Sequence, residues 1–468
     1  MDTMKKLMII LLVFAVSSAQ AQFKADWQSL DKREIPSWWA DAKFGIFIHW
    51  GLYSVPAYAP VNEVKGVYEK YAEHYYNRLL AGNKLFTDFH TKHYGKNFTY
   101  ADFAPMFTAE YFNPTEWAEL FKEAGARYVV LTSKHHDGFC LWPSTQTPQW
   151  NSVVMGPHMD IIDTLSTAVR DAGMRFGLYY SLLEWAHPLY TQPTIEQWVD
   201  THMIPQMKEL VNTYKPEIIF SDGEWDYDSK TLKSEEFLAW LYNESPVKNS
   251  VVANDRWGKE TRSKHGDYYT TEYDLVHSSE GIGDKADHPW EESRGIGTSY
   301  GYNRFETSAH YLSSKQLIDI LIDKVSNGGN FLLNVGPDAT GMIPVVMQER
   351  LLDMGKWLKI NGEAIYSSSP WRNANKPEAG QIAFTQREGN LYVILKEWQQ
   401  DPIIIPGLEQ AGEVELLGYR GRINASLQNG RLTIIPPVLT IDEYPSEHAW
   451  VYKVSDFKDS SKPISSQP

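Results

Sequence analysis

The feature that most constrains the fold of this chain is a regular alternation of short apolar runs with helical segments between Lys43 and Val335. Apolar runs bounded by turn signals are typical of strands buried on both faces of a parallel sheet. We count eight strand candidates, at Lys43–Gly51, Tyr128–Thr132, Arg175–Tyr180, Ile218–Ser221, Ser250–Asn254, Asp267–Thr271, Arg294–Tyr302 and Asn330–Val335. Repeated strand–helix units of this number predict an α/β fold with a (β/α)8-like barrel.

The helices between these strands have recognisable start signals. Helix starts are predicted at Asn113–Pro114, Asp160, Thr194 and Ser314. The helical pattern is weak between the fifth and seventh strands, so we expect the barrel to be irregular there. The barrel is predicted to occupy residues 22–370, with a long loop carrying short helices between Tyr53 and Tyr100.

The pattern changes after the last predicted barrel helix. From about Ile382 to Tyr452 the sequence has short alternating or apolar runs that are broken by Gly, Pro and Asn. This pattern predicts a C-terminal antiparallel β-sandwich over residues 371–455. Residues 456–468, rich in Lys, Ser and Pro, are predicted to be a disordered tail.

The N-terminus predicts export. Lys5 and Lys6 precede an apolar run from Leu7 to Val16, and Ala19-Gln-Ala21 follows as a cleavage site, so residues 1–21 are interpreted as a secretory signal peptide. The mature protein is expected in a periplasm or outside the cell, and no later stretch predicts a membrane span. The single cysteine, Cys140, is expected to be buried and inert because apolar residues flank it.

The amino-acid composition limits the classes of molecule that this protein is expected to bind. A formal net charge of -15, with no stripe of Lys and Arg, argues against a nucleic-acid partner. Seventeen Trp and 27 Tyr exceed what a core of this size needs, and aromatic rings suit the apolar faces of sugars. Core packing explains part of this aromatic content equally well.

Carboxylates at the predicted strand ends are the main catalytic candidates. Asp222 and Glu272 follow two different strands, and the carboxyl ends of parallel strands meet on one face of a barrel. Glycoside hydrolysis needs such a pair, one group to attack the sugar and one to protonate the leaving oxygen. The alternative is structural pairing of either carboxylate with Arg256, Arg262 or Lys134.

Histidines form a second group of candidates. His135 and His136 are adjacent on an extended chain, so their side chains point to opposite sides, and no third metal ligand follows at a recognisable spacing. We therefore expect no metal and no cofactor. Neutral imidazoles, including His49, are better suited to bind sugar hydroxyls because each offers a donor and an acceptor.

These residues lie in a series of motifs that resembles the α-L-fucosidases of glycoside hydrolase family 29. The resemblance extends over the whole barrel and is carried by Phe44–Gly51, Thr132–Phe139, Gly177–Trp185, Ser221–Trp225, Asn254–Gly258, Thr271–Tyr273, Trp290–Glu291, Arg294–Gly297, Tyr300–Arg304 and Asn330–Pro337. It implies an exo-acting, retaining, metal-free hydrolase of terminal α-L-fucosyl linkages in fucosylated glycans.

The resemblance also implies residue roles. Asp222 matches the family nucleophile, and Glu272 matches the general acid/base, with Glu291 as the runner-up. The residues implied to bind the sugar or the catalytic groups are His49, Glu73, His74, His135, His136, Tyr179 and Arg256, and an apolar wall for the C6 methyl is implied at Phe47, Phe220 and Tyr300.

Three departures from the family pattern bear on specificity. His74 and Phe220 stand where many members carry Trp, and the segment between Glu272 and Trp290 is long and polar. Linkage preference, oligomeric state and the role of the β domain are therefore not predicted. The alternative functions are a catalytically silent fucose-binding protein and a glycosidase for another sugar.

Overall fold

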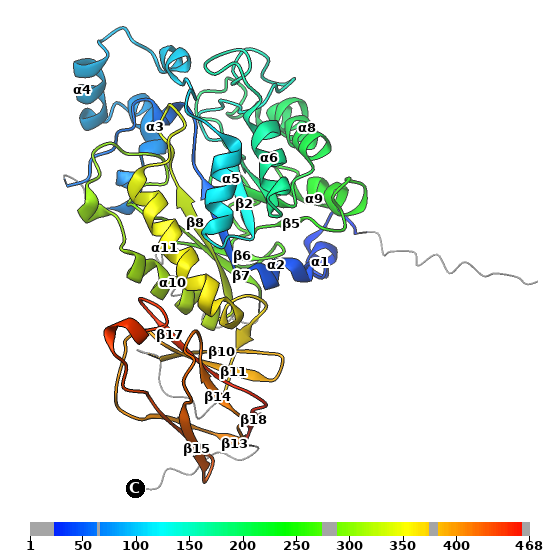
Figure 1. Ribbon diagram of the computed structural model, residues 1–468. Coiled ribbons are helices and arrows are strands. Elements are labelled where there is room, and N and C mark those ends of the chain that lie inside the picture. Colours follow the sequence, from blue (N-terminus) through cyan, green and yellow to red (C-terminus); the bar gives the residue numbers. More distant parts are fainter. Residues whose placement is uncertain (1–22, 63–65, 274–287, 374–381, 461–468) are drawn as a thin grey trace, which may run out of the picture.

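The computed structural model describes residues 23–62, 66–273, 288–373 and 382–460. The predicted signal peptide lies outside the described residues, as does most of the polar segment between Glu272 and Trp290. Figure 1 shows the barrel with its helices above a smaller C-terminal β region.

Eight parallel strands form the predicted barrel sheet, in the order β5-β4-β3-β2-β1-β8-β7-β6. Since β1 pairs with both β2 and β8, the sheet curls round on itself. Within the described residues no ladder joins β5 to β6, so the barrel is open at one seam. The strands are β1(Phe44–Ile48), β2(Tyr128–Lys134), β3(Arg175–Ser181), β4(Ile218–Asp222), β5(Val252–Ala253), β6(Tyr269–Glu272), β7(Trp290–Gly295) and β8(Gly329–Val335).

Side chains bridge the open seam. The Ala253 N–H donates to Asp267 Oδ2 at 2.8 Å, and the Thr270 hydroxyl donates to Asp255 Oδ1 at 2.7 Å. No helix lies between β5 and β6, as the weak helical pattern there predicted.

The seventh strand corrects the prediction at Arg294–Tyr302. β7 begins at Trp290, and only Arg294 and Gly295 are shared with the predicted segment. No apolar run marks this strand, because it carries two buried carboxylates. They are accommodated by hydroxyl donors, Tyr128 to Glu291 and Thr271 to Glu292.

The helices begin close to their predicted caps. The Asn113 side chain accepts from the N–H groups of Thr115 and Glu116, and the Asp160 side chain accepts from the N–H of Asp163. For the last of these helices the predicted cap was Ser314, but the observed cap is Ser313, one residue earlier. The helices of the barrel are α1(Trp27–Leu30), α2(Ser37–Ala42), α5(Pro114–Glu123), α6(Ile161–Asp171), α7(Ile195–Trp198), α8(Ile204–Tyr214), α9(Ser234–Asn243), α10(Ser314–Ser326) and α11(Val345–Asn361). A π-helical turn, Val199–Met203, joins α7 to α8.

The segment between β1 and β2 is the predicted loop with short helices. It contains α3(Tyr75–Leu80) and α4(Lys84–His93), which Figure 1 shows at the end of the molecule opposite the C-terminal region. The 3₁₀ turns of this segment are Leu52–Ser54, Val67–Lys70, Ala72–His74 and Tyr100–Met106.

The C-terminal region consists of antiparallel sheets around a hydrophobic core of its own, as predicted. Its strands are β9(Ser369–Pro370), β10(Ile382–Arg387), β11(Asn390–Leu395), β12(Ile403–Pro406), β13(Leu408–Gln410), β14(Val414–Leu416), β15(Asn424–Gln428), β16(Arg431–Ile435), β17(Trp450–Val454) and β18(Lys458–Asp459). Helix α10 packs against β9 and β10 and so joins the two regions.

One prediction for this region is corrected. The tail was expected to be disordered from residue 456, but β18 pairs there with β13. The Asp459 carboxylate accepts from the indole of Trp371 at 2.9 Å and from the amide of Asn373 at 2.7 Å, which holds the segment in place. Residues 461–468 lie outside the described part.

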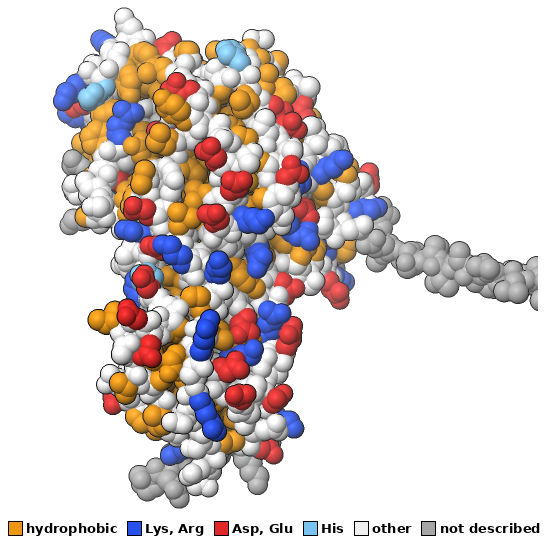
Figure 2. Space-filling model, viewed as in Figure 1, with side chains coloured by type: hydrophobic (Ala, Val, Ile, Leu, Met, Phe, Trp, Pro, Cys, Tyr) orange, Lys and Arg blue, Asp and Glu red, His pale blue; other side chains and the backbone are white. Residues whose placement is uncertain are grey.

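On the face drawn in Figure 2, acidic and basic side chains are interspersed over both regions, so the surplus of acidic charge is not gathered in one block there. None of the described helices combines the length and the apolar character needed to cross a bilayer.

Candidate active site

One pocket, with a volume of about 730 Å³, gathers side chains from the carboxyl ends of the barrel strands. These side chains come from strands β1, β3, β4, β6 and β7 and from the segments that follow β1, β2, β3, β4, β5 and β7, which is where a barrel fold brings such groups together. The predicted site residues that line it are Phe47, His49, Glu73, His74, His135, Tyr179, Phe220, Asp222, Arg256, Glu272 and Tyr300.

Asp222, the last residue of β4, is held as an anion. Its Oδ1 accepts from Arg256 Nη1 at 2.7 Å, and its Oδ2 accepts from the Tyr179 hydroxyl at 2.8 Å. Burial alone would raise the pKa of this carboxyl, but the charge of Arg256, with His136 and Arg262, holds the pKa well below its ordinary value. The group is therefore ready to act as a nucleophile near neutral pH.

Glu272, the last residue of β6, is linked to Asp222 through one guanidinium. Arg256 Nη2 donates to Glu272 Oε2 at 3.3 Å, while the Tyr71 hydroxyl donates to Glu272 Oε1 at 2.7 Å. Arg256 is itself oriented, because its Nε donates to the Thr270 hydroxyl at 3.0 Å. The two carboxylates thus face one pocket from different strands, held apart by a fixed cation.

Glu291, the runner-up acid, does not line this pocket. It is the second residue of β7, near the amino end of the strand, and is 1% exposed. Its partner is the hydroxyl of Tyr128, at the start of β2, and burial raises its pKa to about 8. Two residues further along the same face of β7, Ser293 does line the pocket.

Two histidines have tautomers that are set by neighbouring groups. The Asn334 amide donates to the Tyr300 carbonyl, so its oxygen faces His49 Nδ1 at 2.7 Å, and that nitrogen carries the proton. The Ser181 hydroxyl donates to the Leu183 carbonyl and therefore accepts from His136 Nδ1 at 2.5 Å. In both rings Nε2 is left as an acceptor.

All four histidines of the site are uncharged. Burial lowers the pKa of His49 and His74 to about 3 and that of His136 to about 4, and it holds the pKa of His135 well below its ordinary value. His136 is not a lining residue, but its Nε2 lies 3.6 Å from Asp222 Oδ2. His135 Nδ1 is buried without a hydrogen-bond partner in the described residues. Neutral imidazoles with free nitrogens suit hydroxyl groups.

Glu73 supplies a buried acceptor from the loop after β1. Its Oε2 accepts from the Gly301 N–H at 2.8 Å and the Ser299 hydroxyl at 3.0 Å. Its Oε1 is buried and has no partner in the described part of the chain. Burial raises the pKa of Glu73 to about 7. A hydroxyl-bearing ligand would satisfy the free oxygen.

The predicted apolar wall is present. The ring of Phe47 lies 5.0 Å from that of Phe220 and 6.2 Å from that of Tyr300, and all three are buried. They form a patch beside the polar groups, and such a patch suits a methyl substituent on a sugar ring.

Asp137 and Cys140, close to the paired histidines, have structural roles. Asp137 accepts from the Tyr100 hydroxyl at 2.7 Å and from the Phe139 N–H at 3.1 Å, which leaves neither oxygen free. Cys140 is buried, as expected, and burial raises the pKa of its thiol.

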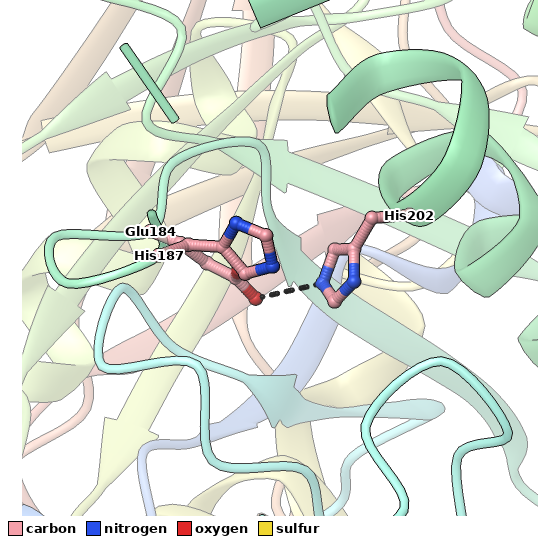
Figure 3. A group of neighbouring side chains, drawn as sticks. All are labelled: Glu184, His187 and His202. Atoms are coloured by element: carbon pink, nitrogen blue, oxygen red, sulfur yellow. Dashed lines mark hydrogen bonds and ion pairs between the residues drawn. The ribbon is translucent and has the colours of Figure 1, made fainter. Parts of the chain in front are cut away.

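A group of three potential metal ligands, Glu184, His187 and His202, lines a different pocket, and its ligand atoms lie within 4.8 Å of one another (Figure 3). The dashed line in Figure 3 is the bond between His202 Nε2 and Glu184 Oε1, at 3.2 Å. The same oxygen accepts from the Lys134 ammonium at 2.8 Å, and the Leu189 N–H donates to His187 Nδ1. Because an ammonium already neutralises Glu184, the group fits a buried ion-pair cluster rather than a cation site.

Several lining residues were not identified from the sequence. Tyr71, which donates to Glu272, lies in the loop without a clear period, so no spacing marked it. Trp185 and Trp225 follow strand ends within family motifs, which was the available signal. Glu224, which also lines the pocket, is paired with Arg262.

Comparison with known proteins decides the family. A family profile described as Alpha-L-fucosidase matches residues 10–363. The chain belongs to the α-L-fucosidase family. The tissue alpha-L-fucosidase of Rattus norvegicus is 41% identical over 463 residues, covering 95% of this chain and 96% of the relative, and that of Homo sapiens is 40% identical, covering 97% of each.

Solved α-L-fucosidase structures share the architecture. The alpha-fucosidase of Thermotoga maritima, in complex with a mechanism-based inhibitor, has a TM-score of 0.80 and 39% identity, covering 92% of this chain and 99% of that one. The same enzyme in complex with fucose has a TM-score of 0.79. The expected family, fold and enzyme class are confirmed, and this α-L-fucosidase family member is a glycoside hydrolase.

Proposed function

We propose that this protein is a retaining, exo-acting α-L-fucosidase with Asp222 as nucleophile and Glu272 as general acid/base. The observation that carries the proposal is the pair of carboxylates joined by Arg256, of which Asp222 is kept ionised. In the first step Asp222 attacks the anomeric carbon, while Glu272 gives its proton to the departing glycosidic oxygen. The product of this step is a covalent fucosyl-enzyme.

In the second step water replaces the leaving group. Glu272, now a carboxylate, removes a proton from the water as it attacks the anomeric carbon, and the bond to Asp222 breaks with net retention. Arg256 stays charged throughout, because nearby carboxylates hold its pKa well above the ordinary value. It therefore stabilises whichever carboxylate is anionic.

Sugar recognition follows from the remaining lining residues. Glu73 Oε1, His49 Nε2 and His135 Nδ1 would bind the ring hydroxyls, and Phe47 and Phe220 would contact the C6 methyl. The Asp222 side chain is only 11% exposed, which suits a terminal sugar better than an internal one. The complex of the Thermotoga enzyme with fucose supports a fucosylated glycan as substrate.

The test is hydrolysis of an aryl α-L-fucoside followed by NMR. Wild type should release α-L-fucose first, and Asp222→Ala should lose at least about 1,000-fold in kcat, since a nucleophile of this kind is required for every turnover. Asp200→Ala, which removes a carboxylate outside the pocket, is the matched control. If Asp222→Ala keeps wild-type turnover, the nucleophile assignment is wrong.

The same assays separate the two alternatives. A silent fucose-binding protein would bind L-fucose in calorimetry without turning over the aryl fucoside. A glycosidase for another sugar would be inhibited better by L-rhamnose or D-galactose than by L-fucose.

We further propose export through residues 1–21, on the basis of the charged, apolar and Ala-x-Ala segments of the N-terminus. The N-terminal sequence of the mature protein from its native host should begin close to Gln22.

A further inference from the structure

The pocket has an exposed outer part, here called the rim, and a buried inner part, here called the floor. The carboxylates and their donors are buried, whereas the rings of Tyr68 and Trp225, which also line the pocket, are 45% and 46% exposed. The volume of about 730 Å³ lies in the range of pockets that bury drug-sized ligands, which are larger than a single 6-deoxyhexose. The pocket therefore has room beyond the sugar that is cleaved.

Each exposed ring is connected in space to one of the two catalytic carboxylates through a single intervening side chain. The ring of Tyr68 is 5.6 Å from that of Tyr71, whose hydroxyl donates to Glu272. The ring of Trp225 is 5.2 Å from that of His136, whose Nε2 is 3.6 Å from Asp222. The two exposed rings therefore lie near the place where the leaving group of a sugar held between the two carboxylates would be.

The rim also offers hydrogen-bond donors that nothing else uses. Among the residues that the structure describes, no hydrogen-bond partner is present for the indole N–H groups of Trp185 and Trp225 or the side-chain amide of Asn77. On the floor, by contrast, most polar groups are paired. Free donors beside an exposed ring suit a ligand with one apolar face and several oxygen acceptors.

We propose that Tyr68 and Trp225, together with these donors, form a subsite for the aglycone. Its ligand is the pyranose residue that carries the fucose, an uncharged hexose or N-acetylhexosamine. An apolar face of that ring stacks on an exposed side chain, and its hydroxyl or acetamido oxygens accept from the rim donors. This inference rests on the proposed function.

The test compares two substrates that differ only in the leaving group. α-L-Fucosyl fluoride has no aglycone ring, whereas a fucosyl-N-acetylglucosamine disaccharide has one. The ratio of kcat/KM for the disaccharide to kcat/KM for the fluoride should fall about 3- to 10-fold in Trp225→Ala and again in Tyr68→Ala. Trp225→Phe and Tyr68→Phe keep a ring and should keep most of the ratio.

The controls separate the outcomes. Tyr111→Ala removes an exposed aromatic ring outside this pocket and should leave the ratio at its wild-type value. If the ratio of the two kcat/KM values is unchanged in Trp225→Ala and Tyr68→Ala, the proposal of an aglycone subsite is wrong, even where kcat/KM falls equally for both substrates. If wild type cleaves neither substrate, the proposed function fails instead.

Discussion

Replacing Arg256 with methionine would remove the cation that joins the two carboxylates. The guanidinium donates to Asp222 at 2.7 Å and to Glu272 at 3.3 Å. Hydrogen bonds to charged groups contribute about 1.5–3 kcal/mol each. Loss of one such contribution in the transition state should lower kcat/KM near neutral pH by roughly 10- to 150-fold.

The pH dependence should change as well, in a defined direction. The charge of Arg256 is the largest of the influences that lower the pKa of Asp222 against the effect of burial. Without it the pKa rises, so a smaller fraction of Asp222 is ionised at low pH. The acid limb of the kcat/KM profile should therefore move upward by about one pH unit or more.

Arg256→Lys is the matched control, since lysine keeps the charge but cannot bond both carboxylates in a fork. It should lose rate while its acid limb stays close to that of wild type. The assay is kcat/KM for an aryl α-L-fucoside between about pH 3 and 8, with thermal unfolding to confirm that each variant is folded. A wild-type acid limb in Arg256→Met would refute the electrostatic reasoning.

Three further predictions concern individual carboxylates. Glu272→Ala should impair substrates with poor leaving groups most, and azide should restore part of the rate; if Glu291→Ala behaves this way instead, the two residues exchange roles. Burial raises the pKa of Glu291 to about 8, so the folded state retains a proton that the unfolded chain loses above about 4.5. The free energy of unfolding of wild type should therefore fall as pH rises from about 5 to 8, by up to about 1.4 kcal/mol per unit, and Glu291→Gln should flatten this fall in chemical denaturation. Glu184→Ala leaves the Lys134 ammonium buried without its carboxylate and should lower the free energy of unfolding by about 3–5 kcal/mol. EDTA should leave the melting temperature of wild type unchanged, because the ion pair already neutralises the group of Glu184, His187 and His202.

Much of the barrel could be predicted because its strands are apolar and its helices begin with capping residues. Seven of the eight predicted strands overlap the observed ones closely, and the exception is β7. That strand buries Glu291 and Glu292 on its two opposite faces, where hydroxyl groups from β2 and β6 bond them. A polar strand of this kind has no periodic signal, because the groups that make it stable lie far away in the sequence.

In the site, too, residues marked by the local sequence pattern could be predicted, whereas residues placed only by distant contacts could not. Asp222 and Glu272 end strands, so their positions could be inferred from the apolar runs before them. Tyr71 could not, since it reaches Glu272 from a loop 201 positions earlier. Glu291 was named from a motif match, and such a match says nothing about the depth of a residue along its strand, so its distance from the pocket could not be predicted.

The open seam between β5 and β6 has a consequence for how this scaffold can change. Arg256 reaches across the seam to Thr270 and Glu272, so the group that we propose stabilises both carboxylates during turnover also stands in for the missing backbone ladder. In a fully closed barrel the backbone holds the strands, and the residues at their carboxyl ends are free to be exchanged for new chemistry. Here, drift at Arg256 would be opposed by selection on folding and on catalysis together, and a change of reaction would first require another way to join the two edges.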